Sequence, residues 1–430
     1  MSPVDGAWLR MDSPTNPMVI NAVLLLEGAV PQAEIERLLR ERLLPHPRFR
    51  RRAVSSSVPL YPSRWEEDPH FDLATHLHHV AVPSPGDEGA LAELIGDIIS
   101  SPLDHDRPLW QIHHVEGLAS GSALIARVHH AVGDGVALVK LLIGLTDEGP
   151  RKAPPRVGLT GRGASGLTEY AALAGAKAVS LARMLALPAD PTGPLKGPLG
   201  IRKRVAWSRA FDVESIKRAA HVRSAKLNDI VVATVAGAIK TYLETHGSEQ
   251  ESLRALVPVY VPRHAQGAEM GNHFGLVFLQ MPIGPASLEG RIVEAKRAMD
   301  DLKRAPDALV AMTVLGAMGL ASEGIERIGI SIFTKKASML LTNVPGPAEA
   351  LHLLGRRLSS VLVWAPVSGD VALGVSLMSY AGSMRMGVSA DARVVADPRA
   401  IVTAFEDLFE RTLAAGRGSE GGAGELHGMK

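Results

Sequence analysis

Apolar residues along the first third of the chain follow two alternating spacings. Gln32–Leu44 repeats apolar positions at helical spacing, whereas Ser122–His130 reads as a strand that leads into a helix over Val136–Leu145. Alternation of short strands with amphipathic helices is typical of a mixed α/β domain. We therefore expect such a domain over residues 1–148, ending where the composition shifts at Glu148.

A second alternation begins near Val205 and follows a connector. Residues 149–200 hold two Pro- and Gly-rich stretches on either side of a helix predicted over Leu167–Leu187. The pattern then predicts a second mixed domain over residues 201–415 and a disordered tail over residues 416–430, which are mostly Gly and small polar residues. The elements expected in this domain are a helix at about Asn228–Thr245 and strands at Leu253–Val261 and Val371–Ser379. The fold class is α/β (α+β), with two domains joined by a long crossover.

Composition narrows the function classes. The 430 residues are 46% apolar, which is enough to fill two cores. Because 46 basic and 45 acidic residues nearly cancel, the overall charge gives no reason to expect a nucleic-acid partner. The absence of cysteine excludes disulfides, thiolate zinc sites and a cysteine nucleophile, and it suits a cytoplasmic protein.

The apolar runs are too short to cross a bilayer. A spanning helix needs about 20 apolar residues, and the longest candidate, Ala308–Ala321, has the length of a buried or interfacial helix. The amino terminus also lacks the basic-then-apolar pattern of a secretory signal. We expect a protein that is soluble or peripherally attached to a membrane.

Three histidine doublets mark candidate chemistry: His78-His79, His113-His114 and His129-His130. Only the last precedes Gly-Asp-Gly at a predicted strand-to-helix turn. Neighbouring side chains of a strand point to opposite faces, so one imidazole can face an apolar channel while the other packs elsewhere. The glycines beside Asp134 permit the sharp turn.

A neutral imidazole can take the proton of an alcohol that attacks a thioester. Such a reaction needs no metal, and Asp134 could orient the loop by a hydrogen bond or ion pair. A purely structural doublet is an equally good interpretation of these residues alone. A metal site built from His129, His130 and Asp134 is a weaker one, because opposite-facing side chains do not converge easily on one ion.

The segment from His129 to Gly135 resembles the HHxxxDG signature of CoA-dependent acyltransferases and peptide-synthetase condensation domains. Further blocks resemble the bacterial wax ester synthase/diacylglycerol acyltransferase family and follow its order over nearly the whole chain. They are Ser2-Pro-Val-Asp5, Pro47-Arg-Phe-Arg50, Pro102–Trp110, Leu227-Asn-Asp229, Met270-Gly-Asn272 and Thr342–Pro347.

This resemblance implies two chloramphenicol-acetyltransferase-like domains, each a mixed β-sheet with helices, with an active-site tunnel between them. It also implies transfer of a long-chain fatty acyl group from acyl-CoA, a substrate, to diacylglycerol or a long-chain fatty alcohol, without a cofactor or metal. Such substrates lead us to expect peripheral attachment at the inner membrane face or lipid inclusions. The alternatives are an acyltransferase that takes its acyl group from a carrier protein and a non-catalytic lipid-binding protein.

The resemblance also assigns residues. It makes His130 the general base, His129 a supporting neighbour, and Asp134, followed by Gly135, a loop-orienting residue. In condensation domains this aspartate pairs with an arginine, for which Arg50 is the nearest counterpart here. Arg48, Arg51 and Arg52 crowd the same stretch, so a surface arginine cluster is an equal alternative.

The roles of four further polar residues and one aromatic residue are not decided by the sequence. Asn228 and Asp229 sit at a predicted helix start, where asparagine is a common N-cap, so capping competes with a part in the site. Asn272 and Asn343 lie in turns, and either could donate to the oxyanion of acyl transfer. Trp110 reads as a core aromatic in preference to a substrate contact.

Overall fold

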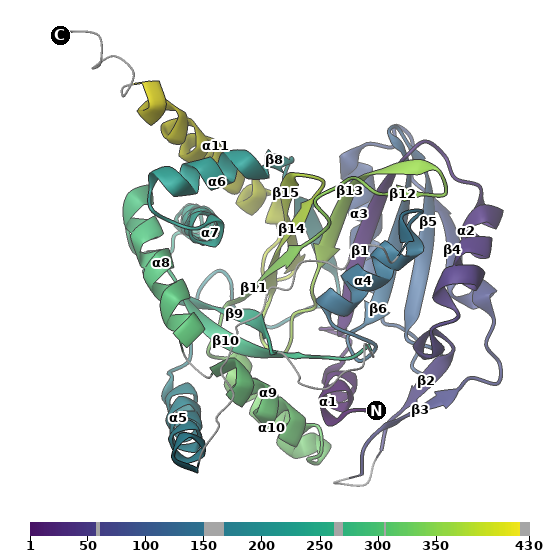
Figure 1. Cartoon of the computed structure of the whole chain (residues 1–430), viewed down its shortest axis with the longest axis horizontal. Coiled ribbons are helices and arrows are strands. Elements are labelled where there is room, and N and C mark those ends of the chain that lie inside the picture. The colour runs from purple at the N-terminus through teal and green to yellow at the C-terminus, as the bar shows by residue number, and fades with distance from the viewer. Residues whose placement is uncertain (57–60, 150–166, 262–269, 305–306, 422–430) are drawn as a thin grey trace.

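Two β-sheets stand side by side and carry helices on their outer and lower surfaces (Figure 1). The structure is a computed structural model, and it describes residues 1–56, 61–149, 167–261, 270–304 and 307–421. Of the connector expected over residues 149–200, residues 150–166 lie outside the described residues. Among the residues that are described, no helix is both long and apolar enough to cross a membrane.

The first sheet has six strands in the order β12-β13-β1-β6-β5-β4. Central strand β1 pairs antiparallel with β6 and β13, while β4 runs parallel to β5. The strands are β1 (Val19–Glu27), β4 (Leu77–Ala81), β5 (Trp110–Leu118), β6 (Gly121–His129), β12 (His352–Leu353) and β13 (Arg356–Trp364). Two strands from the second half of the chain thus complete the sheet built by residues 1–148.

Helices cover both faces of this sheet, as its alternating apolar residues require. Helix α3 (Glu88–Ile99) packs against Val23, Val115 and Ile125. The other face carries α2 (Gln32–Leu38), which continues as a π-helical turn over Leu39–Leu43, and α4 (Gly135–Leu145). The helices predicted over Gln32–Leu44 and Val136–Leu145 are confirmed.

The second sheet has the order β10-β9-β11-β14-β15-β7, with β8 also paired to β15. Helix α7 is buried along most of its length and forms the centre of the core on one face, together with α6, α8 and α11. The strands are β7 (Lys203–Trp207), β8 (Phe211–Asp212), β9 (Leu253–Tyr260), β10 (Phe274–Met281), β11 (Met339–Pro345), β14 (Leu373–Tyr380) and β15 (Ser383–Asp391). The helices are α6 (Val213–Val222), α7 (Leu227–Thr245), α8 (Leu288–Arg304) and α11 (Pro398–Gly421).

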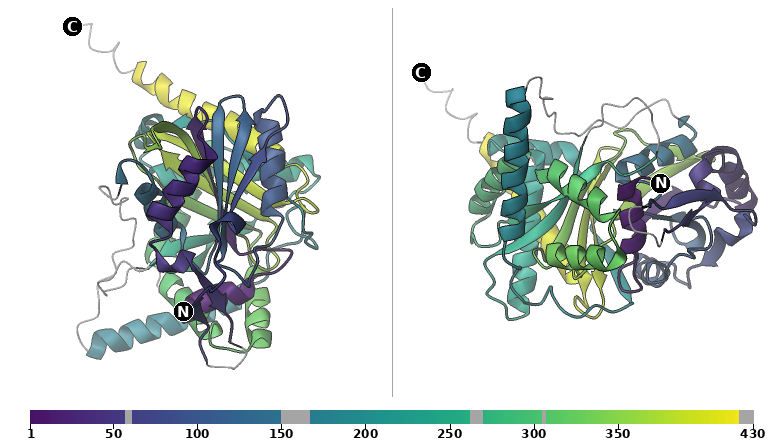
Figure 2. Two further views of the ribbon diagram at one scale, coloured as in Figure 1. Left: turned by 90° about the vertical axis from the view of Figure 1, so that its right-hand side faces the viewer. Right: turned by 90° about the horizontal axis from the view of Figure 1, so that it is seen from below.

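Four further helices lie at the lower side of the molecule, as the view from below shows (Figure 2). They are α1 (Pro3–Met11), α5 (Leu167–Ala186), α9 (Asp307–Met318) and α10 (Glu323–Thr334). Helix α1, from the start of the chain, packs against α9 of the second half. The remaining regular elements are a separate pair of strands, β2 (Arg51–Val54) and β3 (Arg64–Glu67), and two single 3₁₀ turns, Pro47–Phe49 and Leu73–Thr75.

The predicted tail needs correction. Helix α11 continues to Gly421, so residues 416–421 are helical where disorder was expected, and residues 422–430 lie outside the described part of the chain. Glycine is a poor helix former but not an absolute breaker, and a helix anchored by Phe405 and Phe409 in the core can propagate past several of them.

Candidate active site

His130 follows the last residue of β6 and lies where the two halves of the chain meet. Its backbone N–H donates to the carbonyl of Met18 at 2.7 Å, which continues the β1–β6 pairing by one residue. The imidazole stacks on Trp8 of α1, with ring centroids 4.2 Å apart, and Phe274 of β10 lies at 5.3 Å. Aromatic side chains from both halves therefore hold the ring in place.

Asn272 determines the tautomer of His130. Its Oδ1 lies 2.7 Å from His130 Nδ1, while its Nδ2 donates to Asp5 Oδ1 and to the His130 carbonyl, each at 2.8 Å. Because the amide nitrogen is committed to two acceptors, the amide oxygen must accept from Nδ1–H. His130 Nε2 then carries the lone pair, and it makes no hydrogen bond with any described residue.

Burial sets the charge of His130. The residue is 6% exposed, and burial lowers the pKa of its imidazole, with the Asp134 carboxylate and the Asn272 hydrogen bond acting in the opposite direction. The ring is therefore neutral near pH 7. A neutral imidazole with a free Nε2 lone pair is the form that acts as a base.

His129 has a different hydrogen-bonding arrangement and is fully buried. Its Nδ1 accepts from the backbone N–H of Ala131 at 3.0 Å, so the neutral ring carries its hydrogen on Nε2. That Nε2 lies 3.9 Å from Asp12 Oδ2, which is also 2.7 Å from His105 Nε2. Burial lowers the pKa of His129 to about 3, and the side chain stabilises the turn as a neutral group.

Asp134 joins the turn to the second half of the chain. It is the N-cap of α4: its Oδ1 accepts from the backbone N–H of Ala137 at 2.9 Å, and its Oδ2 accepts from that of His273 at 3.0 Å. Gly135, the first residue of α4, lies against Val344 of β11, which an added Cβ would approach to 4.0 Å. The carboxylate holds the turn in place through these backbone hydrogen bonds.

The arginine that reaches this turn is Arg48. Its Nη1 donates to the carbonyls of Ala131 and Val132 at 3.3 and 2.9 Å and lies 3.5 Å from Asp5 Oδ2. Arg50, two residues further on, is exposed. Spacing alone could not separate the two, because both arginines flank the single buried residue Phe49.

Asn228 and Asn343 meet in a second polar pair. Asn343 Nδ2 donates to Asn228 Oδ1 at 2.9 Å, which connects the end of β11 to the first turn of α7. The capping expectation for Asn228 is wrong: α7 begins at Leu227, and Asp229 Oδ2 accepts from the backbone N–H of Lys226 at 2.8 Å. The carboxylate takes this role because it sits at the third helical position, from which it reaches back to the cap residue.

Trp110 is a core residue in this structure. It is 1% exposed, its indole N–H donates to the Phe49 carbonyl at 2.9 Å, and its ring stacks on His76 with centroids 4.6 Å apart. Two other parts of the site were not expected as contacts of this turn: the Asp5 carboxylate behind Asn272 and the Trp8 ring on His130. Asp5 ends one of the blocks that resemble the family, whereas Trp8 lies in none of them. Both come from α1, far from the histidines in the chain.

Two sheets with a buried His-His turn at their junction define the two-domain fold of CoA-dependent acyltransferases and condensation domains. A solved wax ester synthase/diacylglycerol acyltransferase from Marinobacter aquaeolei has a TM-score of 0.72 and 22% identity, and the match covers 97% of this chain and 99% of that one. The first condensation domain of the calcium-dependent antibiotic synthetase has a TM-score of 0.60 and 17% identity over 96% of this chain and 94% of that one.

The chain belongs to the wax ester synthase/diacylglycerol acyltransferase family and is an acyltransferase. Residues 1–160 match the family's catalytic domain and residues 270–412 its C-terminal domain. A Mycobacterium tuberculosis (strain CDC 1551) protein, provisionally named a diacylglycerol O-acyltransferase, is 30% identical over 96% of this chain and 90% of its own length. A second, from strain H37Rv and also provisionally named so, is 29% identical over 92% of this chain and 91% of its own length.

Proposed function

We propose that this enzyme transfers a long-chain fatty acyl group from acyl-CoA to the hydroxyl of diacylglycerol or a long-chain fatty alcohol, with His130 as general base. The observation that carries the proposal is the fixed tautomer of His130, whose Nδ1 is held by Asn272 and whose Nε2 is free of protein hydrogen bonds among the described residues. No metal or cofactor takes part in the proposed reaction.

A single imidazole both accepts and returns the proton in the proposed reaction. Nε2 takes the hydroxyl hydrogen as the acceptor oxygen attacks the thioester carbonyl, and the tetrahedral intermediate then expels the CoA sulfur. The imidazolium returns its proton to that sulfur, so the products are an ester and free CoA. Asn272 Oδ1 and the Asp134 carboxylate both favour the transient cation, because each raises the pKa of His130 against burial.

Replacement of His130 by glutamine tests the base. General bases contribute about 10²–10⁴-fold to rate, so H130Q should lose a factor of this order in kcat with an unchanged circular dichroism spectrum. A matched control is His352→Gln, which alters an exposed histidine remote from the turn and should retain wild-type turnover. Near-normal ester formation by H130Q would refute the assignment.

The acceptor is settled by direct assay. Mycobacterial relatives carry the name diacylglycerol O-acyltransferase, while the family name also includes wax ester synthesis. Purified enzyme given palmitoyl-CoA with either dipalmitoylglycerol or hexadecanol should release one CoA for each ester formed with at least one of them. Binding of palmitoyl-CoA without CoA release would favour a lipid-binding protein, and turnover only with a carrier-protein donor would favour the secondary-metabolism alternative.

An apolar stripe on α10 supports peripheral attachment to a lipid surface, at the inner membrane face or on lipid inclusions. Ile325, Ile328 and Ile332 follow helical spacing and are 63%, 64% and 48% exposed. The opposite face of α10 is fixed by a buried ion pair between Glu326 and Arg10 of α1, 2.6 Å apart. An apolar stripe on a helix held in this way is available to insert among acyl chains.

Helices α5 and α9 contribute unequally to this side of the molecule. Helix α5 exposes Val179 and Leu185, at 69% and 60%. Helix α9, in contrast, buries Ala308, Val310 and Ala311 against its neighbours. Helices α5 and α10 lie on the same lower side (Figure 2), and we assign the surface contact to them.

Liposome flotation tests this surface. The triple variant I325S/I328S/I332S should lose retention on vesicles while it still turns over short-chain, water-soluble substrates. The control is Val293→Ser, a substitution of a 59% exposed apolar residue on α8. Equal flotation of the triple variant and the wild type would dismiss the α10 contact.

A further inference from the structure

The other two histidine doublets form a ladder between β4 and β5. These strands are parallel, and their register places His78 opposite His113 and His79 opposite His114. The first pair lies on the sheet face covered by α3, with Val80 and Val115. The second pair therefore lies on the opposite face, on the side of α2, with ring centroids 5.1 Å apart. Acyl transfer at His130 uses neither pair.

Glu116 joins the second pair to make a three-residue cluster. It follows His114 by two residues on β5, and one ligand atom from each of His79, His114 and Glu116 lies within 4.8 Å of the others. His79 Nε2 is 3.0 Å from one Glu116 oxygen, and His114 Nε2 is 4.0 Å from the other. Tetrahedral zinc, with bonds of about 2.0–2.2 Å, needs ligand atoms roughly 3.2–3.6 Å apart. The side chains of His79 and Glu116 are 49% and 43% exposed, so both can rotate to bring the three ligand atoms to this spacing.

His114 is oriented as a metal ligand would be. The residue is fully buried, and its Nδ1 lies 2.8 Å from Oε1 of Gln32, the first residue of α2. Since the amide oxygen accepts, the hydrogen is on Nδ1 and the lone pair is on Nε2. An outer oxygen that accepts from the second ring nitrogen is the usual support of a metal-bound histidine.

The Nε2 lone pair of His114 faces the Glu116 carboxylate, whose nearer oxygen lies 4.0 Å away. This buried nitrogen has no hydrogen-bond partner among the described residues. His129, also near two potential ligands, differs: its Nδ1 accepts from Ala131, so its Nε2 carries a hydrogen and offers no lone pair to an ion.

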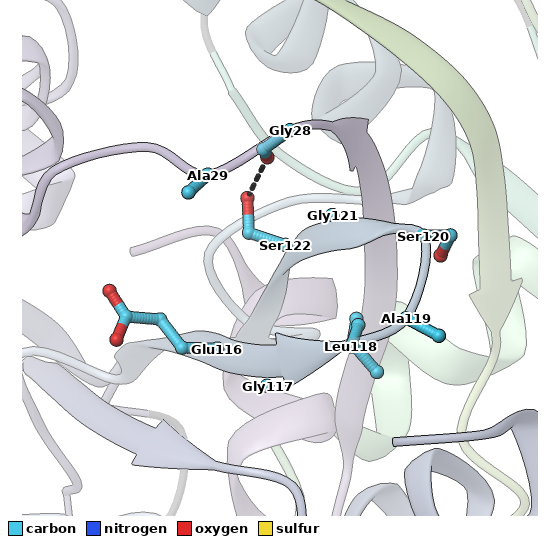
Figure 3. A pocket seen from close by; sticks show the side chains of 9 residues that line it. All are labelled: Gly28, Ala29, Glu116, Gly117, Leu118, Ala119, Ser120, Gly121 and Ser122. Atoms are coloured by element: carbon cyan, nitrogen blue, oxygen red, sulfur yellow. Dashed lines mark hydrogen bonds between the residues drawn. The ribbon is translucent and has the colours of Figure 1, made fainter. Parts of the chain in front are cut away.

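We propose that His79, His114 and Glu116 bind one divalent transition-metal ion of the Zn²⁺ class, with solvent completing the coordination. Two imidazoles and a carboxylate suit zinc and its first-row neighbours. Glu116 also lines a hollow formed by the β5–β6 turn and residues 28–29, which opens the carboxylate to solvent (Figure 3). The bound ion would join the edge strand β4 to β5.

This site is separate from the proposed acyl-transfer chemistry. His114 pairs with Leu124, five residues along β6 from His129, which corresponds to roughly 16 Å at the usual rise per strand residue. The ion would therefore act on the sheet edge and not on the reacting atoms. Loss of metal binding and loss of acyl transfer are consequently independent results.

The experiment measures Zn²⁺ binding by the tag-free, chelator-treated full chain with a competing chromophoric chelator, and the melting temperature with and without Zn²⁺. We expect one high-affinity ion per chain and a higher melting temperature with zinc. H79Q and E116Q should each weaken binding at least tenfold and abolish the thermal shift, with acyl transfer unchanged. Both side chains are partly exposed, so both variants should fold. Gln32→Met should weaken binding by about 10–100-fold, the usual effect of removing such a partner.

The matched control is His352→Gln. His352 Nδ1 lies at hydrogen-bond distance, 2.8 Å, from a Glu148 carboxylate oxygen, and its side chain is 47% exposed, close to the 49% of His79. H352Q should bind zinc as the wild type does. If the wild type does not bind one zinc ion per chain, the proposal is overturned in favour of a metal-free histidine ladder. Equal loss of zinc binding in H352Q and H79Q would overturn it in favour of non-specific surface binding.

Discussion

His130 Nδ1 and Asn272 Oδ1 lie 2.7 Å apart although 142 positions separate the two residues in the chain. His130 belongs to the segment that matches the family's catalytic domain, and Asn272 to the segment that matches its C-terminal domain. The tautomer of the proposed base is thus set by a residue from the other half of the molecule. Catalytic competence depends on how the two halves dock as well as on the His-His turn.

Asn272→Leu tests this dependence. Leucine has nearly the same volume but cannot accept from Nδ1–H, so His130 loses the partner that fixes its tautomer and steadies the imidazolium. We expect kcat to fall about 10²-fold, within the range that general-base catalysis contributes, while KM for acyl-CoA changes little. Steady-state kinetics with palmitoyl-CoA separate the effect on kcat from the effect on KM. A rise in KM at constant kcat would instead make Asn272 a substrate contact.

The local pattern was sufficient to predict much of the fold. The strand before His130, the helix after Asp134 and the helix that begins beside Asn228 are all present, because each depends on periodicity and turn chemistry within a few residues. The family blocks identified the turn itself. The contribution of β12 and β13 to the first sheet was not predicted, because strand pairing over more than 300 residues leaves no local signature.

The contacts of the turn could not be predicted for the same reason, although the family blocks include Asp5 and Asn272. Asp5, Trp8 and Asn272 are remote from His130 in sequence and meet it only through the docking of α1 and the loop before β10. Arg48 and Arg50 show a further limit of prediction from the sequence. Their chemistry is identical, and only the backbone conformation around buried Phe49 decides which one points at the turn. Patterns of residue type carry no information on that choice.

Arg48→Met and Arg50→Met form a matched pair. Arg48 satisfies two loop carbonyls and lies beside the buried Asp5 carboxylate, so its loss leaves acceptors unpaired at a cost of about 1–3 kcal/mol. Arg50 is exposed, and surface substitutions usually change stability by less than about 0.5 kcal/mol. Urea denaturation and kcat should both show R48M impaired and R50M close to wild type. The opposite order would identify Arg50 as the arginine that supports the turn.

His129 can be tested by a substitution that keeps one atom. Asparagine places an oxygen near the position of Nδ1, where it can accept from the Ala131 N–H, whereas alanine leaves that buried N–H unpaired and a cavity behind it. H129N should therefore keep more stability and more activity than H129A. Thermal melts and initial rates of the two variants make the comparison. Equal and complete loss of turnover in both, with melting temperatures unchanged, would show that His129 contributes chemistry of its own.

The pH profile of kcat/KM reports the charge of the free enzyme's base. Burial places the pKa of His130 below its ordinary value of 6.5, and only the neutral ring can take a proton, so activity should persist below pH 6.5 and fall at more acid pH. The Asp134 carboxylate raises this pKa, so Asp134→Asn should move the acid limb to still lower pH. The same variant should lose stability, because an amide group cannot accept from both Ala137 and His273 as the carboxylate does. The measurement is the pH profile of kcat/KM for the wild type and D134N between pH 4.5 and 8 at constant ionic strength. It tests the sign of both shifts. An acid limb centred above pH 6.5 in the wild type, or one that moves upward in D134N, would be incompatible with a buried neutral His130 beside a carboxylate.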